Sequence, residues 1–224
     1  MAKPLIVFDM DGVLVDVTES YREAIIHVVK HFTGKEVSHL TIQEYKNTGG
    51  YNNDWKLSHK LISEFGVEVD YATVVDYFNQ IFLYSGEQSL IHRERWIAAD
   101  GLLNRIGEKH DFAIYTGRLQ EEADITLKRY ANGLRFDPVL CHDHVVQSKP
   151  HPEGLLKIAG LKPERKIWYI GDTVDDARCG KSAGIAFIGI ASPKAVGWRE
   201  LSALLKQEGA VAVLDDINQL ETVL

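Results

Sequence analysis

Short apolar runs recur along this chain, and stretches of helical, amphipathic character separate most of them. The runs are rich in β-branched and aromatic residues and occupy 5–8, 111–115, 138–141, 166–170, 185–190 and 211–214. Runs that are apolar at every position, with helices between them, indicate parallel strands buried on both faces. The sequence therefore predicts an α/β fold built on a parallel sheet with covering helices.

The alternation of strand and helix fails between residues 17 and 93. Four stretches in this region have helical periodicity, and none has the pattern of a strand. We therefore expect a helical domain over 17–93, inserted into an α/β core domain formed by residues 1–16 and 94–224.

Composition limits the partners of the chain. The 224 residues carry a formal net charge of −7 and contain no block of Lys and Arg, which argues against nucleic acid or an anionic membrane as a partner. The longest apolar stretch, 184–191, is shorter than the roughly 20 residues of a membrane-spanning helix. Only two cysteines, Cys141 and Cys179, occur, and no secretory leader opens the sequence, so we expect a cytoplasmic protein without disulfides.

Polar residues with catalytic potential stand at the ends of several predicted strands. Ligands of open parallel sheets bind beyond the carboxyl ends of the strands, where such residues come together. We therefore expect one site formed by Asp9 and Asp11 after the first strand, Thr116-Gly117-Arg118 after the second, Lys149 before the fourth, and the acids from Asp172 to Asp176 after it.

Converging carboxylates require a cation. Asp9, Asp11, Asp172 and Asp176 would carry a formal charge of about −4, which is unfavourable without compensation. Mg²⁺ suits such a site because it accepts a few carboxylates together with water and phosphate. With Mg²⁺ and Lys149 present, the site could bind a phosphate group for nucleophilic attack by an aspartate.

Four motifs, in order, resemble those of the haloacid dehalogenase superfamily: FDMDG at 8–12, YTGR at 115–118, SKPHP at 148–152 and GDTVDD at 171–176. The helical insertion after the first strand resembles the subfamily with a helical cap, which includes phosphoglycolate phosphatase-like proteins. The resemblance implies a Rossmann-like core, with Asp9 as the nucleophile that forms an aspartyl-phosphate. It implies that Asp11 is the general acid and base, because an alkoxide leaving group needs a proton whereas a halide does not.

The same resemblance gives roles to residues farther along the chain. Thr116 would hydrogen-bond the phosphoryl group, with Gly117 and Arg118 near the substrate, although Arg118 fits a surface salt bridge equally well. Lys149 would neutralise charge on Asp9 and the phosphoryl group. Mg²⁺ would be held by Asp9, Asp172 and the backbone carbonyl of Asp11. Asp176 would hold Lys149 or a metal-bound water, and the role of Asp175 stays open.

Two further segments each have two interpretations. The stretch GGYNNDW at 49–55 would place Tyr51 and Asn52 against the leaving group, or would only end one helix and begin the next at Asn53. The segment Cys141–His144 resembles a soft-metal cluster, but a structural loop fits its position better.

Together these features predict Mg²⁺-dependent hydrolysis of a small phosphate monoester through an aspartyl-phosphate. A phosphomutase, which returns the phosphoryl group to another hydroxyl of its substrate, is the first alternative. A non-catalytic binding protein is the second. The sequence leaves open the identity of the phosphorylated metabolite and the oligomeric state.

Overall fold

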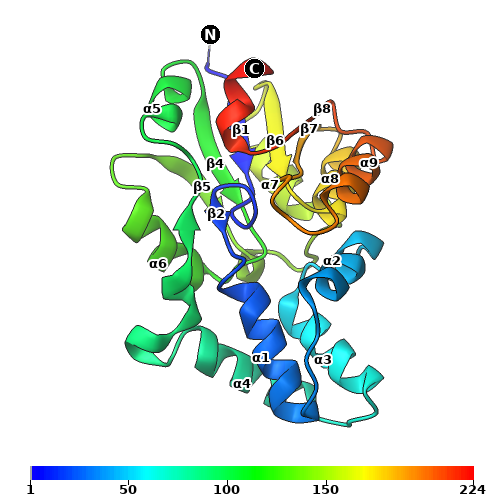
Figure 1. Cartoon of the computed structure of the whole chain (residues 1–224). Coiled ribbons are helices and arrows are strands. Elements are labelled where there is room, and N and C mark those ends of the chain that lie inside the picture. Colours follow the sequence, from blue (N-terminus) through cyan, green and yellow to red (C-terminus); the bar gives the residue numbers. More distant parts are fainter. Residues whose placement is uncertain (1) are drawn as a thin grey trace.

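The core of the protein is a six-stranded parallel sheet in the order β5-β4-β1-β6-β7-β8. A computed structural model describes residues 2–224 (Figure 1). The strands are β1 (Leu5–Phe8), β4 (Asp111–Tyr115), β5 (Phe136–Leu140), β6 (Ile167–Gly171), β7 (Ala186–Ile190) and β8 (Ala212–Leu214). All six predicted strands are present within one or two residues of their expected bounds, so the predicted α/β fold is confirmed.

Strand β1 lies at the centre of the sheet. It pairs in parallel with β4 on one side and with β6 on the other, so Phe8 aligns with both Ile114 and Ile170. The carboxyl ends of these three strands therefore reach the same edge at the same level. From β1 the chain runs outward through β4 and β5, and from β6 it runs outward the other way through β7 and β8. The strand order therefore reverses between β1 and β6. Such a topological switch point is where ligands of these folds bind.

Both faces of β1 are buried, which explains its unbroken apolar sequence. Ile6 and Phe8 pack in one cluster of core residues, and Leu5 and Val7 pack in another. The first cluster includes side chains from α5 (Leu102–Gly107) and α6 (Gln120–Tyr130), and the second includes side chains from α7 (Glu153–Leu161), α8 (Val174–Ala183) and α9 (Trp198–Gln207).

A short antiparallel pair of strands flanks the predicted insertion. In this pair β2 (Val15–Asp16) lies beside β3 (Arg95–Trp96). Between them the chain forms α1 (Tyr21–Thr33), α2 (His39–Thr48), α3 (Asp54–Glu64), α4 (Tyr71–Phe82) and two 3₁₀ turns (Gly86–Gln88 and Leu90–Arg93). These helices lie below the sheet in Figure 1 and share a separate apolar cluster that includes Ile25, Leu61 and Phe78. In residues 2–224 no helix has both the length and the hydropathy required to cross a membrane.

Candidate active site

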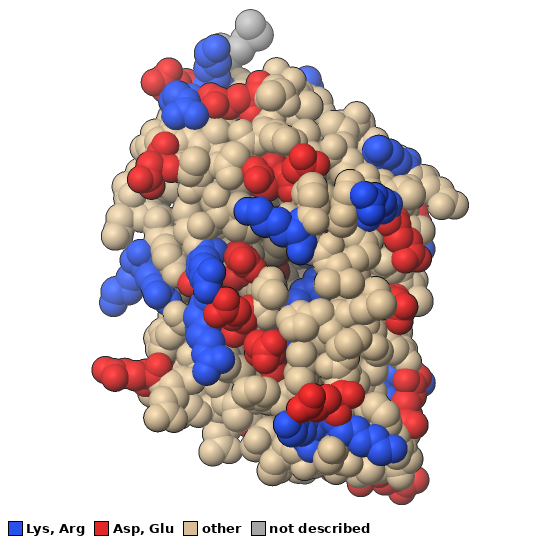
Figure 2. Space-filling model, viewed as in Figure 1, with Lys and Arg blue, Asp and Glu red and all other residues tan. Residues whose placement is uncertain are grey.

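The expected site residues meet at the carboxyl edge of the sheet, in a cleft between the sheet and the helices of the insertion. Asp9 directly follows β1, Thr116 follows β4 and Asp172 follows β6. Asp9, Asp11, Gly117, Arg118 and Asp172 all line this cleft. Figure 2 shows basic and acidic side chains gathered around the hollow in this face of the molecule. Sequence reasoning thus located the core side of the site.

Lys149 joins two of the buried acids. Its Nζ atom lies 3.0 Å from Asp9 Oδ2 and 2.8 Å from Asp176 Oδ1, and all three side chains are at most 4% exposed. A charge buried to this extent is tolerated only when it is paired. Asp176 was expected to hold either Lys149 or a metal-bound water. In the structure it contacts Lys149.

The start of α8 holds Asp176 in a single orientation. Thr173 is the N-cap of the helix: its hydroxyl accepts a hydrogen bond from the Asp176 amide and donates one to Asp176 Oδ2 over 2.6 Å. Tyr169 on β6 donates its hydroxyl to Asp176 Oδ1 over 2.5 Å. These bonds leave Asp176 facing Lys149, so it positions the lysine beside Asp9.

Asp172 lies close to the turn after β1. Gly12 in that turn has a φ of +68°, and a Cβ atom at this position would lie 1.9 Å from Asp172 Oδ2. A side chain there would be strained by its backbone conformation and would also collide with the carboxylate. The glycine of the DxDG sequence thus allows Asp172 to approach the nucleophile turn.

The acids of the site fit a divalent cation. One carboxylate oxygen from each of Asp9, Asp172 and Asp176 lies within 4.8 Å of the other two. Burial raises the pKa of Asp9 to about 7 against the opposing charge of Lys149, and burial followed by the charges of Asp176 and Asp9 raises the pKa of Asp172 well above its usual range. Ionising all of these acids therefore calls for positive charge beyond Lys149. Oxygen ligands of this kind suit Mg²⁺.

Asp11 is bound by Arg118, which is 1% exposed and is not a surface residue. The Arg118 Nε and Nη2 atoms donate to Asp11 Oδ1 over 2.8 and 2.5 Å. The same guanidinium contacts Glu94 Oε1 at 2.8 Å and donates to Thr126 Oγ1 over 2.8 Å. Its Cζ atom also lies over the Tyr21 ring, 5.1 Å from the ring centre. The surface salt bridge considered for Arg118 is therefore wrong, because the Arg118 side chain is itself fully buried.

Glu94 and Thr126 are members of this network that sequence reasoning missed. Thr126 also donates to Glu94 Oε2 over 2.7 Å, so the two side chains close a ring with Arg118. Glu94 lies in the connection back from the insertion to the core, immediately before β3. The network therefore links Asp11 to the segment on which the insertion joins the core.

The phosphate-binding candidates lie in an adjoining hollow. Thr116 and Lys149 line it together with Gly117, Gly50 and Asn52. The Thr116 hydroxyl accepts a hydrogen bond from the Arg118 amide over 3.3 Å, so its proton is free to point into the hollow. Thr116 and Lys149 thus lie at one hollow, as expected for a pair that contacts one group.

The segment Gly49–Asn53 is attached to the core by Asp175. Both carboxylate oxygens of Asp175 accept a hydrogen bond from the Gly50 amide over 2.9 Å. The Asn53 side chain accepts a hydrogen bond from the Lys56 amide over 2.8 Å. Asn53 is therefore the N-cap of α3, as the N-cap interpretation required. Asp175, whose role was left open, therefore joins the loop of the insertion to the helix that carries Asp176.

Asn52 and Tyr51 differ in placement. Asn52 lines the cleft. The Tyr51 ring instead packs edge-on against Tyr45 at 5.3 Å, with Lys56 Nζ 5.4 Å from its centre. Tyr51 is thus not among the cleft residues, because its apolar ring packs on the helices of the insertion.

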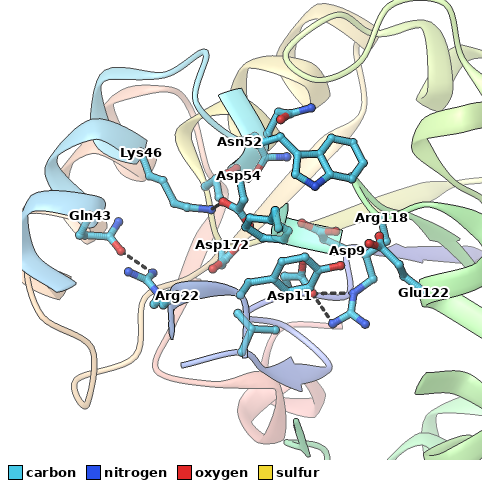
Figure 3. A pocket seen from close by; sticks show the side chains of 17 residues that line it. Asp9, Asp11, Arg22, Gln43, Lys46, Asn52, Asp54, Arg118, Glu122 and Asp172 are labelled. Carbon is cyan, nitrogen blue, oxygen red and sulfur yellow. Dashed lines mark hydrogen bonds and ion pairs between the residues drawn. The ribbon is translucent and has the colours of Figure 1, made fainter. Parts of the chain in front are cut away.

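The insertion contributes a polar wall that sequence reasoning did not assign. Figure 3 shows Arg22, Gln43, Lys46 and Asp54 opposite Asp172. Lys46 Nζ forms an ion pair with Asp54 Oδ1 at 2.7 Å, and the Arg22 Nη2 atom donates to Gln43 Oε1 over 2.7 Å. These residues lie on α1, α2 and α3, and no motif or spacing in the sequence relates them.

The Cys141–His144 segment forms a loop with internal hydrogen bonds. Ligand atoms of Cys141, Asp143 and His144 lie within 4.8 Å of one another. The Cys141 amide, however, donates to His144 Nδ1 over 3.1 Å, and Asp143 accepts the Gln120 amide over 3.2 Å. Burial raises the pKa of the Cys141 thiol to about 12, so the thiol stays protonated near neutral pH. These contacts favour the structural interpretation of the loop.

Comparison with known proteins identifies the family. Residues 6–190 match the family model described as haloacid dehalogenase-like hydrolase. The chain therefore belongs to the haloacid dehalogenase-like hydrolase family, and the predicted resemblance is confirmed.

Relatives extend this match over most of the chain. An imidazoleglycerol-phosphate dehydratase of Phytophthora nicotianae is 31% identical over 96% of this chain, which spans 51% of that relative. Pyrophosphatase PpaX of Bacillus velezensis is 24% identical over 83% of this chain and 82% of its own. A haloacid dehalogenase-like protein of Agrobacterium tumefaciens superposes with a TM-score of 0.74 at 18% identity, covering 99% and 97% of the two chains. The family match and the pyrophosphatase relative agree with an enzyme of the hydrolase class. The Agrobacterium structure shows the shared fold.

Proposed function

We propose that the protein is a Mg²⁺-dependent phosphatase that hydrolyses a small phosphate monoester through an aspartyl-phosphate on Asp9. One observation carries the proposal. Asp9 directly follows the central strand, with Oδ2 3.0 Å from Lys149 Nζ, and it lies beside the carboxylates of Asp172 and Asp176. A buried nucleophile beside a fixed cation and a set of metal ligands is the arrangement that phosphoryl transfer to a carboxylate requires.

The residues of the chain account for each step. A carboxylate oxygen of Asp9 attacks phosphorus, and the bond to the leaving oxygen breaks as that oxygen takes a proton from Asp11. Water then attacks phosphorus, Asp11 takes its proton, and Asp9 departs as a carboxylate. Lys149 and the Thr116 hydroxyl hold the phosphoryl oxygens. Asp9, Asp172 and the Asp11 carbonyl would hold Mg²⁺, which would supply further charge neutralisation.

Asp11 has one oxygen suited to the proton. Both hydrogen bonds that Arg118 donates to Asp11 go to Oδ1, whereas Oδ2 makes no hydrogen bond within residues 2–224. Arg118 therefore fixes the carboxyl group while the proton is carried on the other oxygen. This assigns Arg118 a positioning role, since its own guanidinium stays protonated.

Residues 17–93 would act as a cap domain over the core formed by 1–16 and 94–224. The cap side of the cleft would exclude water from the phosphoryl group and limit substrate size, which favours a metabolite over a polymer. The bond between Gly50 and Asp175 supports this proposal, because it closes the cap loop onto the core.

The test is a panel of phosphorylated metabolites with Mg²⁺ and detection of released phosphate. We expect at least one substrate, with turnover falling by about 10³-fold or more in Asp9→Asn, because the amide cannot form the covalent intermediate. Asp100→Asn, an exposed acid away from the cleft, is the matched control and should keep wild-type turnover. Hydrolysis retained in Asp9→Asn would refute the proposal.

A phosphomutase is a second candidate because cationic cap side chains, Arg22 and Lys46, line the cleft. Such an enzyme would need a second phosphate held by the cap while the first is transferred. Turnover that depends on a bisphosphate activator, with little release of free phosphate, would select this candidate. Phosphate release at the rate of substrate loss would reject it.

A further inference from the structure

Three cationic side chains line the cleft between cap and core, and they differ in how their charge is balanced. Lys46 is paired with Asp54, and Arg118 is paired with Asp11 and Glu94. Arg22 has no carboxylate within ion-pair distance among the residues that the structure describes. Its charge is therefore the least compensated of the three.

The neutral partner of Arg22 is itself fixed. Gln43 is 4% exposed, and its Nε2 atom donates to Asn47 Oδ1 over 2.8 Å. This bond holds the Gln43 oxygen toward Arg22, where it accepts a single hydrogen bond over 2.7 Å. A guanidinium has five N–H donors. Arg22 is thus oriented by a neutral amide while most of its donors and its full charge stay available.

Arg22 lines two hollows of the molecule. It lines the inner cleft with Asp9 and Asp172, and it also lines an outer hollow of about 390 Å³ that extends to Ser192 and Asn218. Figure 3 shows Arg22 and Gln43 on the far side of Asp172 from Arg118. A phosphoryl group beside Asp9 and Lys149 would place the remainder of its substrate toward this wall.

We propose that Arg22 is a specificity residue that binds an oxyanion, either a carboxylate or a second phosphate, on the leaving group of the substrate. Gln43 positions the guanidinium without neutralising it. The planar donors of arginine match both kinds of oxyanion in a bidentate manner. This inference rests on the proposed phosphatase function and names the substrate class: phosphate monoesters with a second anionic group.

A simpler role for Arg22 is to offset the charge of the core acids. The two roles predict different results. A residue that only balances the acids would change the affinity for Mg²⁺ and would affect all phosphate esters equally. A residue that binds the leaving group would discriminate between esters that differ only in a remote group.

The experiment uses three probes with the same three-carbon chain: glycerol 3-phosphate, 3-phosphoglycerate and propane-1,3-diyl bisphosphate. Each is measured as a competitive inhibitor of p-nitrophenyl phosphate hydrolysis with Mg²⁺. We expect wild type to bind at least one of the two charged probes about tenfold or more tightly than glycerol 3-phosphate, since a desolvated ion pair is worth that ratio. The preferred probe identifies the oxyanion as carboxylate or phosphate.

Two variants test the residue. Arg22→Gln should reduce the preference for the charged probe by about tenfold. Gln43→Glu should reduce it similarly, because the new carboxylate would pair with Arg22. Lys30→Gln, which removes the same charge from an exposed position of α1, should keep the wild-type preference. Thermal unfolding confirms that each variant is folded.

Several outcomes would overturn the inference. Equal affinity of wild type for the three probes would do so, as would an unchanged preference in both Arg22→Gln and Gln43→Glu. A uniform loss for all probes together with weaker Mg²⁺ binding by calorimetry would assign Arg22 to balancing the acids. The proposed phosphatase function fails separately, if Asp9→Asn retains hydrolysis of p-nitrophenyl phosphate.

Discussion

The two walls of the cleft differ in how firmly they are built. On the core wall, Asp9, Lys149 and Asp176 are almost fully buried, and each is held by a charged partner. On the cap wall, Arg22 is only partly buried and bonds to a neutral amide. A fixed, paired wall suits chemistry that every substrate shares, whereas a wall with unbalanced charge suits selection among substrates. In the proposed phosphatase, the core wall would therefore carry out catalysis and the cap wall would select the substrate.

Replacing Lys149 with Met tests the core wall and should have the largest effect. The change leaves Asp9 and Asp176 buried without their cation, and breaking a buried pair in this way costs about 3–5 kcal/mol. Urea unfolding with a metal chelator present measures the loss. The control is Lys157→Met, which removes a half-exposed partner of Glu153 and should cost less than about 1 kcal/mol. Similar losses in both variants would mean that the core wall does not depend on this pairing.

The core wall was predictable from sequence because topology alone brings its parts together. Asp9, Thr116 and Asp172 each follow a strand, and the carboxyl ends of adjacent parallel strands reach one edge. Lys149 and Asp176 were predictable through the motifs around them. The strands themselves were recognisable because burial on both faces demands apolar residues at every position.

The cap wall was not predictable in the same way. Arg22 and Gln43 lie on two helices whose contact depends on how the cap packs, and no local pattern records that packing. The contacts of Arg118 and Thr126 with Glu94 likewise join residues 24 and 32 positions apart in the sequence. For the loop at 49–55, the turn and the N-cap followed from local residues. The local residues did not show that Asn52 lines the cleft while Tyr51 packs against Tyr45.

Glu122 lies in the cleft between the two walls and gives a pH-dependent test. Burial raises its pKa to about 7, although the Leu119 amide and the Arg118 charge oppose the shift. The folded state therefore binds an additional proton between the unfolded pKa of 4.5 and about 7. The contribution of Glu122 to the free energy of unfolding is therefore fully present below pH 4.5. It is lost as the pH rises through about 7.

The expected result is a loss of about 2 kcal/mol in wild-type stability from Glu122 between about pH 5 and about pH 8. Glu122→Gln should remove this part of the loss while keeping an acceptor for the Leu119 amide. Urea unfolding of both proteins at the two pH values measures it, and the difference between them isolates Glu122 from Asp9, whose raised pKa acts in the same direction. Parallel pH profiles would show that Glu122 is ionised to the same extent in the folded and unfolded protein.

Asp175 connects the two walls, and its replacement should have the smallest effect on the molecule as a whole. In Asp175→Ala the Gly50 amide loses its acceptor, and one hydrogen bond to a charged group contributes about 1.5 kcal/mol, or roughly tenfold in opening of the loop. Hydrogen exchange of a peptide spanning residues 46–54 should accelerate by that factor, while exchange in β1 stays unchanged. In Asp175→Asn the side chain keeps a carbonyl acceptor, so the same peptide should exchange at an intermediate rate. Unaltered exchange in both variants would show that the cap wall is held against the core by its helices and not by this bond.

The same replacement should also affect substrate binding. Because the loop carries Asn52 into the cleft, faster opening of the loop in Asp175→Ala should raise KM with little change in kcat.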